Sequence, residues 1–294
     1  MSVQSKIIPF TINFFFLLVC LGILFPFLLV IIVSLSSQDS ITDIGYRFIP
    51  NALSLEAYKL IFDSPKIIFR AYGVTAFITL VGTFLSLLMT ALTAYPMSRR
   101  DYAYNRQLAF YIYFTMLFSG GLVPSYILIT QYLHMKDTIW ALIIPYLLNP
   151  FNIMLMKGFM SKIPHELLES AKVDGAREFR IFFTIVLPLS APALATLGLI
   201  ISFAFWNSWF PGMLYIDKDS LAPLQLLLVR IMNNLEFLSS SSEFTQGLSI
   251  DTSKLPSDST RMAMAIVAAG PMLVIFPFFQ RYFVKGLTVG SLKG

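Results

Sequence analysis

Charge is scarce in this 294-residue chain: Asp, Glu, Lys and Arg make up 13% of the residues, whereas 56% are hydrophobic. Ordinary globular domains carry about 25% charged residues, so this chain has too little charge to solvate the surface of a soluble domain. The deficit predicts an integral membrane protein. The net charge of +5 does not indicate nucleic-acid binding, because the basic residues stand at the ends of apolar runs and do not cluster on one arm.

Residues suited to metal or phosphate chemistry are also scarce. The single cysteine, Cys20, lies inside the first apolar run, which excludes an internal disulfide and a cysteine metal site. His165-Glu166 lacks the second histidine that a zinc protease places at helical spacing, and no glycine is followed by the lysine of a phosphate-binding loop. We therefore expect no metal and no cofactor on this chain, and no ATP hydrolysis by it.

Six apolar runs are long enough to cross a bilayer, which takes about 20 helical residues. They are Phe14–Leu35, Ala71–Tyr95, Gln107–Thr130, Ile139–Met160, about Leu187–Phe210, and Met262–Phe279. The first run is too long for the apolar core of a cleaved signal peptide, about 7–15 residues. The sequence predicts an all-α integral membrane protein with six transmembrane helices, and short helices in the two long loops at Ser54–Phe62 and at 222–235.

The distribution of charge orients these helices. Six spans put both termini on one side, and the segments on that side hold 12 Lys or Arg and 5 acidic residues. The segments on the other side hold 9 basic and 11 acidic residues. Positive charge favours the cytoplasm, so we expect both termini to be cytoplasmic.

Helix-breaking residues interrupt four of the runs. They are Gly120, Gly121 and Pro124 in the third, Pro145 and Pro150 in the fourth, Pro192 in the fifth, and Pro271 and Pro277 in the sixth. Broken backbone inside a membrane is tolerated where it lines protein or water, as in transport pathways. Glycine and proline are also commoner in membrane helices generally, so each break has a plain alternative.

A polar group with aromatic neighbours marks a candidate substrate pathway. Asn207 lies between Trp206 and Trp209 near the end of the fifth run, and Asn152 lies in the fourth. Amides can bind the hydroxyls of a sugar while aromatic rings cover its C–H faces. Tryptophans at this depth also form interfacial belts, and the sequence leaves both interpretations open.

The charged stretch "ELLESAKVDGAREFRIFFTIVLPLSAP" (Glu166–Pro192) interrupts this apolar pattern. Its spacing predicts an amphipathic helix capped by Ser161, a turn at Asp174-Gly175, and a second helix from Ala176. The second helix would have an apolar face of Phe179, Phe182, Phe183 and Val186. Such a pair is either a connector lying on the bilayer or a docking device for another protein.

This stretch resembles the EAA signature of ABC importer permeases, in which E-A-A is followed two residues later by D-G-A and then by an apolar pattern ending in L-P. The matching residues are Glu169, Ala171, Asp174, Gly175, Ala176, Phe179, Ile185, Leu187 and Pro188, and Ser170 replaces the usual second-position alanine. In that family the loop is the coupling helix that docks on the ATPase subunit. The resemblance assigns that role to Glu169, Ser170, Ala171, Asp174, Gly175 and Ala176.

Further segments resemble the carbohydrate-uptake branch of the same family. The tail "QRYFVKGLTVGSLKG" (Gln280–Gly294), "FAFWNSWFPGMLY" and "GGLVPSYILI" are similar to the smaller permease subunit of maltose-type importers, and "GSLKG" to the oligosaccharide subgroup. The resemblance covers about residues 70–294. It implies a type I importer architecture, with a first helix and external loop over 1–70, a transmembrane core over 71–284 with the coupling loop at about 161–186, and a cytoplasmic tail over 285–294. It also implies that Gly286, Gly290 and Lys293 of the tail contact the ATPases.

The function implied is that of a non-catalytic permease subunit in a bacterial plasma membrane, forming half of the pathway for a carbohydrate. The partners implied are a second, homologous permease, two copies of an ATPase that bind ATP and Mg, and an extracytoplasmic solute-binding protein or lipoprotein. An ABC permease for an amino acid or peptide is the alternative. A stand-alone secondary transporter or an intramembrane enzyme is disfavoured, because the spans hold essentially none of the ionisable groups that either would use.

Overall fold

The computed structural model describes residues 4–240 and 257–291, and the side chains of residues 11–237 and 258–277. Within these residues every regular element is a helix, apart from an isolated antiparallel bridge between Ser36 and Leu53. The all-α prediction is confirmed. The chain divides into two compact units, Met1–Ile68 with Leu228–Pro271, and Phe69–Leu227 with Met272–Gly294.

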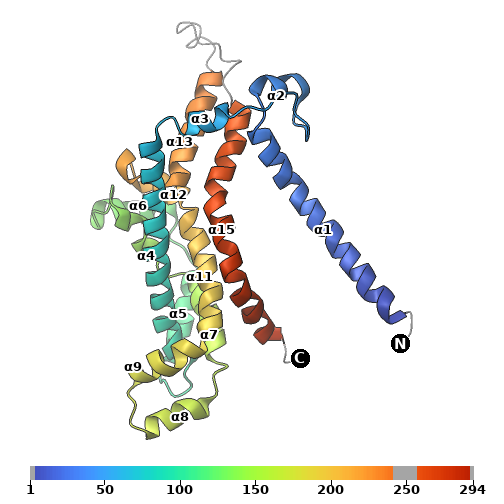
Figure 1. The fold of residues 1–294 in the computed structure, drawn as a ribbon. Helices are drawn as coiled ribbons and strands as arrows, with labels where there is room; N and C mark the ends of the chain where they lie inside the picture. Colours follow the sequence, from blue (N-terminus) through green and yellow to red (C-terminus); the bar gives the residue numbers. More distant parts are fainter. Residues whose placement is uncertain (1–3, 241–256, 292–294) are drawn as a thin grey trace. The chain divides into compact units, whose positions relative to one another are not determined.

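The first unit begins with the most apolar of the three single helices among the described residues that could cross a membrane. Helix α1 (Gln4–Ser34, Figure 1) contains the apolar run Thr11–Ser34, whose mean hydropathy reaches 3.2. A helix that is hydrophobic all round suits a lipid or protein environment within a membrane.

Short helices and hydrogen bonds order the loop that follows α1. Helices α2 (Gln38–Ile44) and α3 (Glu56–Ile61) lie within it. The predicted helix at α3 is confirmed, and the Ser54 hydroxyl accepts a hydrogen bond from the Glu56 N–H at 3.1 Å. Tyr46 and Gln38 both donate to the Asp258 carboxylate, at 3.3 and 3.4 Å, at the beginning of helix α15 (Ser257–Ser291). The loop is therefore a folded part of this unit.

The second unit contains most of the remaining helices. In chain order they are α4 (Pro65–Ser98), α5 (Asn105–Leu117), α6 (Leu122–Ile127), the π-helical turn η1 (Leu128–Tyr132), the 3-10 turns η2 (Ile139–Leu142) and η3 (Ile144–Tyr146), α7 (Pro150–Met160), α8 (His165–Val173), α9 (Glu178–Ile181), the π-helical turn η4 (Phe182–Val186), α10 (Leu187–Leu189), α11 (Ala191–Trp206), α12 (Trp209–Tyr215), the 3-10 turn η5 (Asp219–Leu221), and the beginning of α13 (Leu224–Ser240). Helix α13 confirms the helix predicted at 222–235.

Three single helices among the described residues are long and apolar enough to cross a membrane: those over Thr11–Ser34, Pro65–Ser98 and Asp258–Pro277. Three bent pairs pass the same test jointly, with bends of 110°, 49° and 78° at the breaks that follow α5, η3 and α10. The chain thus has three clear spans, and up to six if each bent pair counts as one.

Some of the predicted helix breaks are present in the structure and others are not. The break at Gly121 is confirmed, and the positive φ of 88° there explains why glycine occupies this position. Pro150 and Pro192 stand in the first turns of α7 and α11, where a missing N–H costs nothing. The predicted breaks at Pro271 and Pro277 are wrong, because α15 continues through both residues.

The core of the second unit lies between helices that approach closely. Ile78 of α4, Met156 of α7 and Leu197 of α11 are fully buried. A Cβ atom at Gly82 of α4 would lie 2.8 Å from ring atoms of Phe205 of α11, closer than carbon atoms can pack. These two helices therefore touch backbone to ring, with no space for a side chain between them.

Candidate functional site

Helix α8 forms the first part of the predicted coupling segment. Its Leu168 is buried in the core of the second unit, whereas Glu166 and Glu169 on the other face are exposed. The predicted cap at Ser161 is wrong. Ser161 ends α7, where its hydroxyl donates to the Lys157 carbonyl at 2.8 Å, and α8 begins after Pro164.

The turn after α8 has the geometry that its sequence predicts. The Gly175 N–H donates to the Lys172 carbonyl at 3.0 Å, and the Ala176 N–H donates to the Ala171 carbonyl at 3.0 Å. These two bonds make a Schellman motif, which places the residue after the C-cap in the left-handed region. Gly175 occupies that place with a φ of 78°, so a side chain there would be strained.

The second helix begins two residues later than predicted, at Glu178 after Arg177. It passes into the π-helical turn η4, which holds more residues per turn and shifts the faces of the helix. Phe182 and Val186 are buried as predicted, but Phe179 and Phe183 are exposed. The expected apolar face is therefore only half correct, because the spacing rule assumed an unbroken α-helix.

The coupling residues implied by the resemblance divide into two groups. Glu169, Ser170, Asp174 and Gly175 are exposed, and Ala171 and Ala176 are half-buried against the core. Glu169 pairs with His165 on its own helix, Oε1 to Nδ1 at 3.1 Å.

Two apolar side chains extend this exposed surface. Val173 is 87% exposed and Phe179 is 74% exposed, on the two sides of the Gly175 turn. We call the exposed surface of Glu169, Ser170, Val173, Asp174 and Phe179 the coupling surface. Sequence reasoning missed Val173 and misassigned Phe179, because periodicity alone counts an apolar residue beside a helix end as core.

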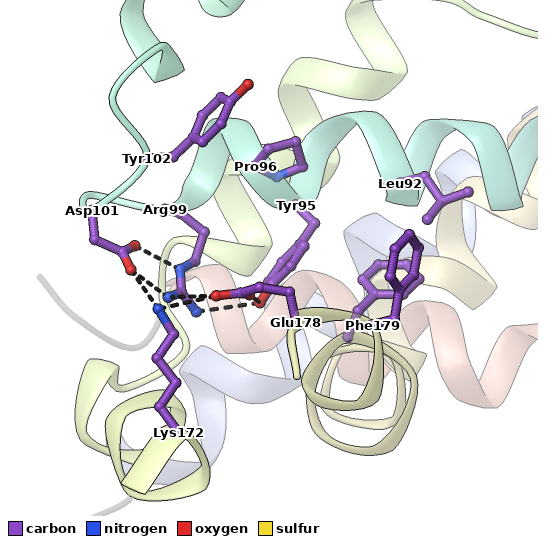
Figure 2. A pocket seen from close by; sticks show the side chains of 10 residues that line it. Leu92, Tyr95, Pro96, Arg99, Asp101, Tyr102, Lys172, Glu178 and Phe179 are labelled. Carbon is purple, nitrogen blue, oxygen red and sulfur yellow. Dashed lines mark hydrogen bonds and ion pairs between the residues drawn. The ribbon is translucent and has the colours of Figure 1, made fainter. Parts of the chain in front are cut away.

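A cavity of about 470 Å³ lies between the coupling segment and the end of α4. Figure 2 shows its lining, in which charged side chains from α8, α9 and the end of α4 converge beside apolar ones. The residues are Leu92, Tyr95, Pro96, Arg99, Asp101, Tyr102, Lys172, Glu178, Phe179 and Phe182.

Hydrogen bonds join five of these side chains in a closed ring (Figure 2). Arg99 donates to both carboxylate oxygens of Asp101, from Nε at 2.8 Å and from Nη2 at 2.6 Å. Lys172 Nζ lies 2.8 Å from Asp101 Oδ2 and 3.0 Å from Glu178 Oε1. The Tyr95 hydroxyl donates to Glu178 Oε2 at 2.6 Å and accepts from Arg99 Nη1 at 3.2 Å. We call these five residues the Arg99 network.

Arg99 and Tyr95 are the buried members of the network, and 5% of the Arg99 side chain is exposed, against 40% for Asp101 and Lys172. The bidentate hydrogen bond from Arg99 holds the pKa of the Asp101 carboxyl well below its usual range and raises the pKa of Arg99. The hydrogen bond to Asp101 likewise raises the pKa of Lys172. All three groups are therefore charged at neutral pH. Sequence reasoning took Arg99 only as a topology signal, since its partner Glu178 lies far along the chain.

A second cavity, of about 570 Å³, contains the predicted pathway asparagines. Asn152 of α7 and Asn207, which follows α11, both line it. Further polar lining comes from Ser86, Tyr146, Asn149 and Ser208. The Asn149 side chain caps α7 by accepting from the N–H groups of Phe151 and Asn152, and Asn207 Nδ2 donates to the Phe203 carbonyl at 3.0 Å.

The two predicted tryptophans do not line this cavity. Trp206 is buried, with its ring centroid 6.4 Å from that of Tyr72, and Trp209 is partly exposed beside Phe210. Neither indole therefore lies with Asn207 in this cavity, because α11 ends at Trp206 and the chain turns before α12. Of the tail residues, Gly286 and Gly290 belong to α15 and Lys293 lies outside the described residues.

Long and broken apolar helices, with an exposed amphipathic segment between two of them, define the class of a multi-pass membrane protein. The chain belongs to the family of binding-protein-dependent transport system inner membrane components, which matches residues 82–289. This confirms the family predicted from the EAA-like stretch.

Curated relatives match nearly the whole chain. It is 38% identical over 291 residues to the polygalacturonan/rhamnogalacturonan transport system permease protein YtcP of Bacillus subtilis (strain 168), covering 99% of this chain and 100% of the relative. It is 37% identical over 269 residues to protein LplC of the same organism, covering 92% and 89%.

A solved structure agrees with this assignment. A chain of a bacterial ABC transporter involved in the import of the acidic polysaccharide alginate superposes with a TM-score of 0.79 at 27% identity, covering 96% of this chain and 99% of that one. The fold is thus that of an ABC importer permease. A permease of this kind works with an ATPase and a solute-binding protein.

Proposed function

We propose that this chain forms one half of the translocation pathway of an ABC importer for an oligosaccharide. The observation that carries the proposal is the similarity over the whole chain to a permease named for polygalacturonan/rhamnogalacturonan transport. The structural likeness to an alginate importer supports it. Both names specify polymeric carbohydrates, so a glycan is the solute class best supported.

The proposed assembly is a heterodimer of this chain with a second, homologous permease, carried on two copies of an ATPase that bind ATP and Mg. An extracytoplasmic solute-binding protein or lipoprotein delivers the solute. The chain spans the bacterial plasma membrane six times, each bent pair counting as one span, with both termini in the cytoplasm. The excess of positive charge in the segments on the terminal side supports this orientation.

The coupling surface is the proposed ATPase contact. Glu169 and Asp174 offer charge, while Val173 and Phe179 offer apolar area that water would otherwise cover. A partner that buries this surface gains from both groups, and the Schellman turn at Gly175 holds them in one orientation. In the tail, Gly286, Gly290 and Lys293 are proposed to contact the same partner.

The second cavity is the proposed pathway lining. Its amide and hydroxyl groups can exchange hydrogen bonds with the hydroxyls of a passing sugar. Asn152→Leu keeps the branched arrangement of four heavy atoms in the side chain but removes its hydrogen-bonding groups, so we expect an assembled complex with slower uptake. Trp209→Leu, outside this cavity, is the control and is expected to leave uptake near the wild-type rate.

The test is uptake by the complete complex in proteoliposomes. The solute-binding protein is loaded with an acidic oligogalacturonide, a neutral oligosaccharide or a peptide, and ATP-dependent uptake of each is measured. We expect a carbohydrate to enter and to stimulate ATP hydrolysis. Stimulation by the peptide alone would support an ABC permease for another solute, and uptake without ATP would support a secondary transporter.

A further inference from the structure

The Arg99 network joins two parts of the second unit that are distant in sequence. Lys172 lies in the last turn of α8 and Glu178 is the first residue of α9, so these two residues flank the Gly175 turn. Tyr95 lies in the last turns of α4, and Arg99 and Asp101 follow directly after it. Each ionic or phenolic contact between these groups is therefore a contact between the coupling segment and α4.

We propose that the Arg99 network is the positioning device through which displacement of the coupling segment moves α4. The proposal rests on the proposed function, because it names the residues that carry motion inward from the ATPase contact. The ring geometry supports it. Moving the coupling segment away from α4 breaks three contacts together, which are Lys172 with Asp101, Glu178 with Tyr95, and Glu178 with Arg99 at 3.6 Å.

The burial of Arg99 makes this joint stiff. An exposed ion pair contributes little, since water replaces its partners readily, but a guanidinium with 5% exposure cannot exchange its carboxylates for water without moving. The network holds two cations and two anions, so it is neutral as a unit. Displacing the segment would leave Arg99 with Asp101 and Tyr95, and Lys172 with Glu178, so the contacts between the two halves of the network would be lost.

A cavity lies beside the network and leaves space in which the coupling segment can move against α4. Leu92 and Pro96 of α4 and Phe179 and Phe182 of the coupling segment line it, and they do not fill the space. The charged ring and the buried Tyr95–Phe182 ring pair, with centroids 5.4 Å apart, are thus the close contacts between these two parts, and the cavity beside them leaves space for movement. Force applied at the coupling surface is transmitted where the contact is tight.

The experiment compares matched lysines in the complete complex. Lys172 Nζ lies 2.8 Å from Asp101 and the side chain is 40% exposed, whereas Lys136 Nζ lies 2.7 Å from Asp217 and its side chain is 42% exposed. Within the described residues Lys136 is paired with Asp217, which follows α12, and forms no ion pair with the coupling segment. Both are replaced by methionine, and uptake and ATP hydrolysis are measured in the same proteoliposomes.

We expect Lys172→Met and Glu178→Gln to lower the number of solute molecules taken up per ATP hydrolysed by at least about fivefold, the lower end of typical couplings between sites. Lys136→Met should leave this ratio unchanged, and Lys172→Arg should restore it to near the wild-type value. A purely structural role would lower thermal stability without changing the ratio. An unchanged ratio in both network variants would overturn the proposal.

Hydrogen exchange of the purified complex, without any solute, gives a second readout that does not depend on the sugar. We expect Glu178→Gln to speed amide exchange in two separate segments together, residues 92–101 and residues 172–182. Faster exchange confined to residues 172–182 would overturn the proposal. A wild-type complex that takes up no carbohydrate would instead contradict the proposed function. The exchange result would still test the role of the Arg99 network, because it does not depend on the solute.

Discussion

Two aspartates tie distant segments of the second unit together, and they do so in different ways. Asp101 accepts hydrogen bonds from the side chains of Arg99 and Lys172. Asp137 Oδ1 accepts from the backbone N–H groups of Asp217 at 2.7 Å and Lys218 at 3.0 Å. A tie to backbone is fixed by the path of the chain, whereas a tie among side chains can break and re-form as segments move. The side-chain contacts of Asp101 therefore suit a joint that moves, and the backbone contacts of Asp137 suit an anchor that does not.

The turns beside the two aspartates differ in the same sense. At the coupling segment the left-handed position is held by Gly175, with a φ of 78°. Near Asp137 the chain adopts positive φ at two residues that are not glycine, His134 at 51° and Asp137 at 56°. Such residues are strained unless their surroundings hold them, and the backbone bonds of Asp137 supply that restraint. The backbone near Asp137 is thus held in a strained conformation by hydrogen bonds, while the turn at Gly175 is unstrained.

Substitution of the left-handed residues is expected to give the largest difference between the two regions. Gly175→Arg adds a side chain where φ is positive and distorts the coupling surface, so the ATPase should no longer co-purify with the inserted permease. Glu169→Lys, which reverses a charge on that surface, should do the same. His134→Arg is the control, because a side chain already occupies its left-handed position.

Retention of the ATPase at wild-type levels by both coupling-surface variants would show that this segment is only a connector. Comparable loss of the ATPase in His134→Arg would show that any bulky change in a left-handed turn acts through folding. The measurement is the ratio of ATPase to permease after affinity purification in mild detergent, beside the abundance of the permease in the membrane.

Removing the charge of each aspartate should give an intermediate difference. Asp101→Asn leaves the buried Arg99 with a neutral partner, which should cost on the order of 2 kcal/mol of unfolding free energy after allowing for the exposure of Asp101. Asp137→Asn keeps an amide oxygen that accepts both backbone N–H bonds, so this variant should lose less unfolding free energy. Thermal unfolding of the purified complex measures both, and equal losses would erase the distinction between joint and anchor.

Acid should give the smallest difference in the physiological range. The hydrogen bond from Arg99 lowers the pKa of Asp101, and the backbone N–H groups of Lys218 and Asp217 lower the pKa of Asp137. A carboxyl with a lowered pKa stabilises the fold above its ordinary pKa, about 3.9, and that contribution is lost as pH falls below it. Both ties should therefore hold unchanged from about pH 5 to about pH 8.

Melting temperature measured against pH checks this expectation. Wild type should lose stability below about pH 4, and Asp101→Asn should lose less of it over the same range, because one titrating carboxyl is gone. A loss of stability as pH rises from 5 to 7 in wild type that Asp101→Asn abolishes would mean that the pKa of Asp101 is raised and the network is not charged as described.

Much of this fold was predictable because its signals are local. Apolar runs located the helices, the glycines at 120 and 121 located the sharpest break, and Asp174-Gly175 identified the turn at the coupling segment. The π-helical turn η4 was not predictable from spacing, and it moved Phe179 and Phe183 to the surface. Pro271 and Pro277 failed as breaks because a long helix can absorb proline within a membrane.

The candidate site was predictable only in its contiguous part. The coupling residues lie within eight positions of one another, so a pattern could find them. Tyr95 and Glu178 are separated by 83 positions, and nothing in either segment alone indicates the other. The grouping in the second cavity was equally unpredictable, because Asn152 lies in α7 and Asn207 follows α11. Trp206 and Trp209, the neighbours of Asn207 in sequence, do not line this cavity, because the chain turns at Asn207.

The contact between Gly82 and Phe205 also bears on the kinetics of transport. With the ring of Phe205 against the backbone of α4, neither helix can slide or rotate past the other without a collision, so α4 and α11 should travel as one rigid body. The change of shape then falls to the bent joints at Gly121 and at Ser190, which precedes α11. Under the proposed function, the contact between these two helices would stay unchanged during transport, and the speed of the movement would be determined at those joints.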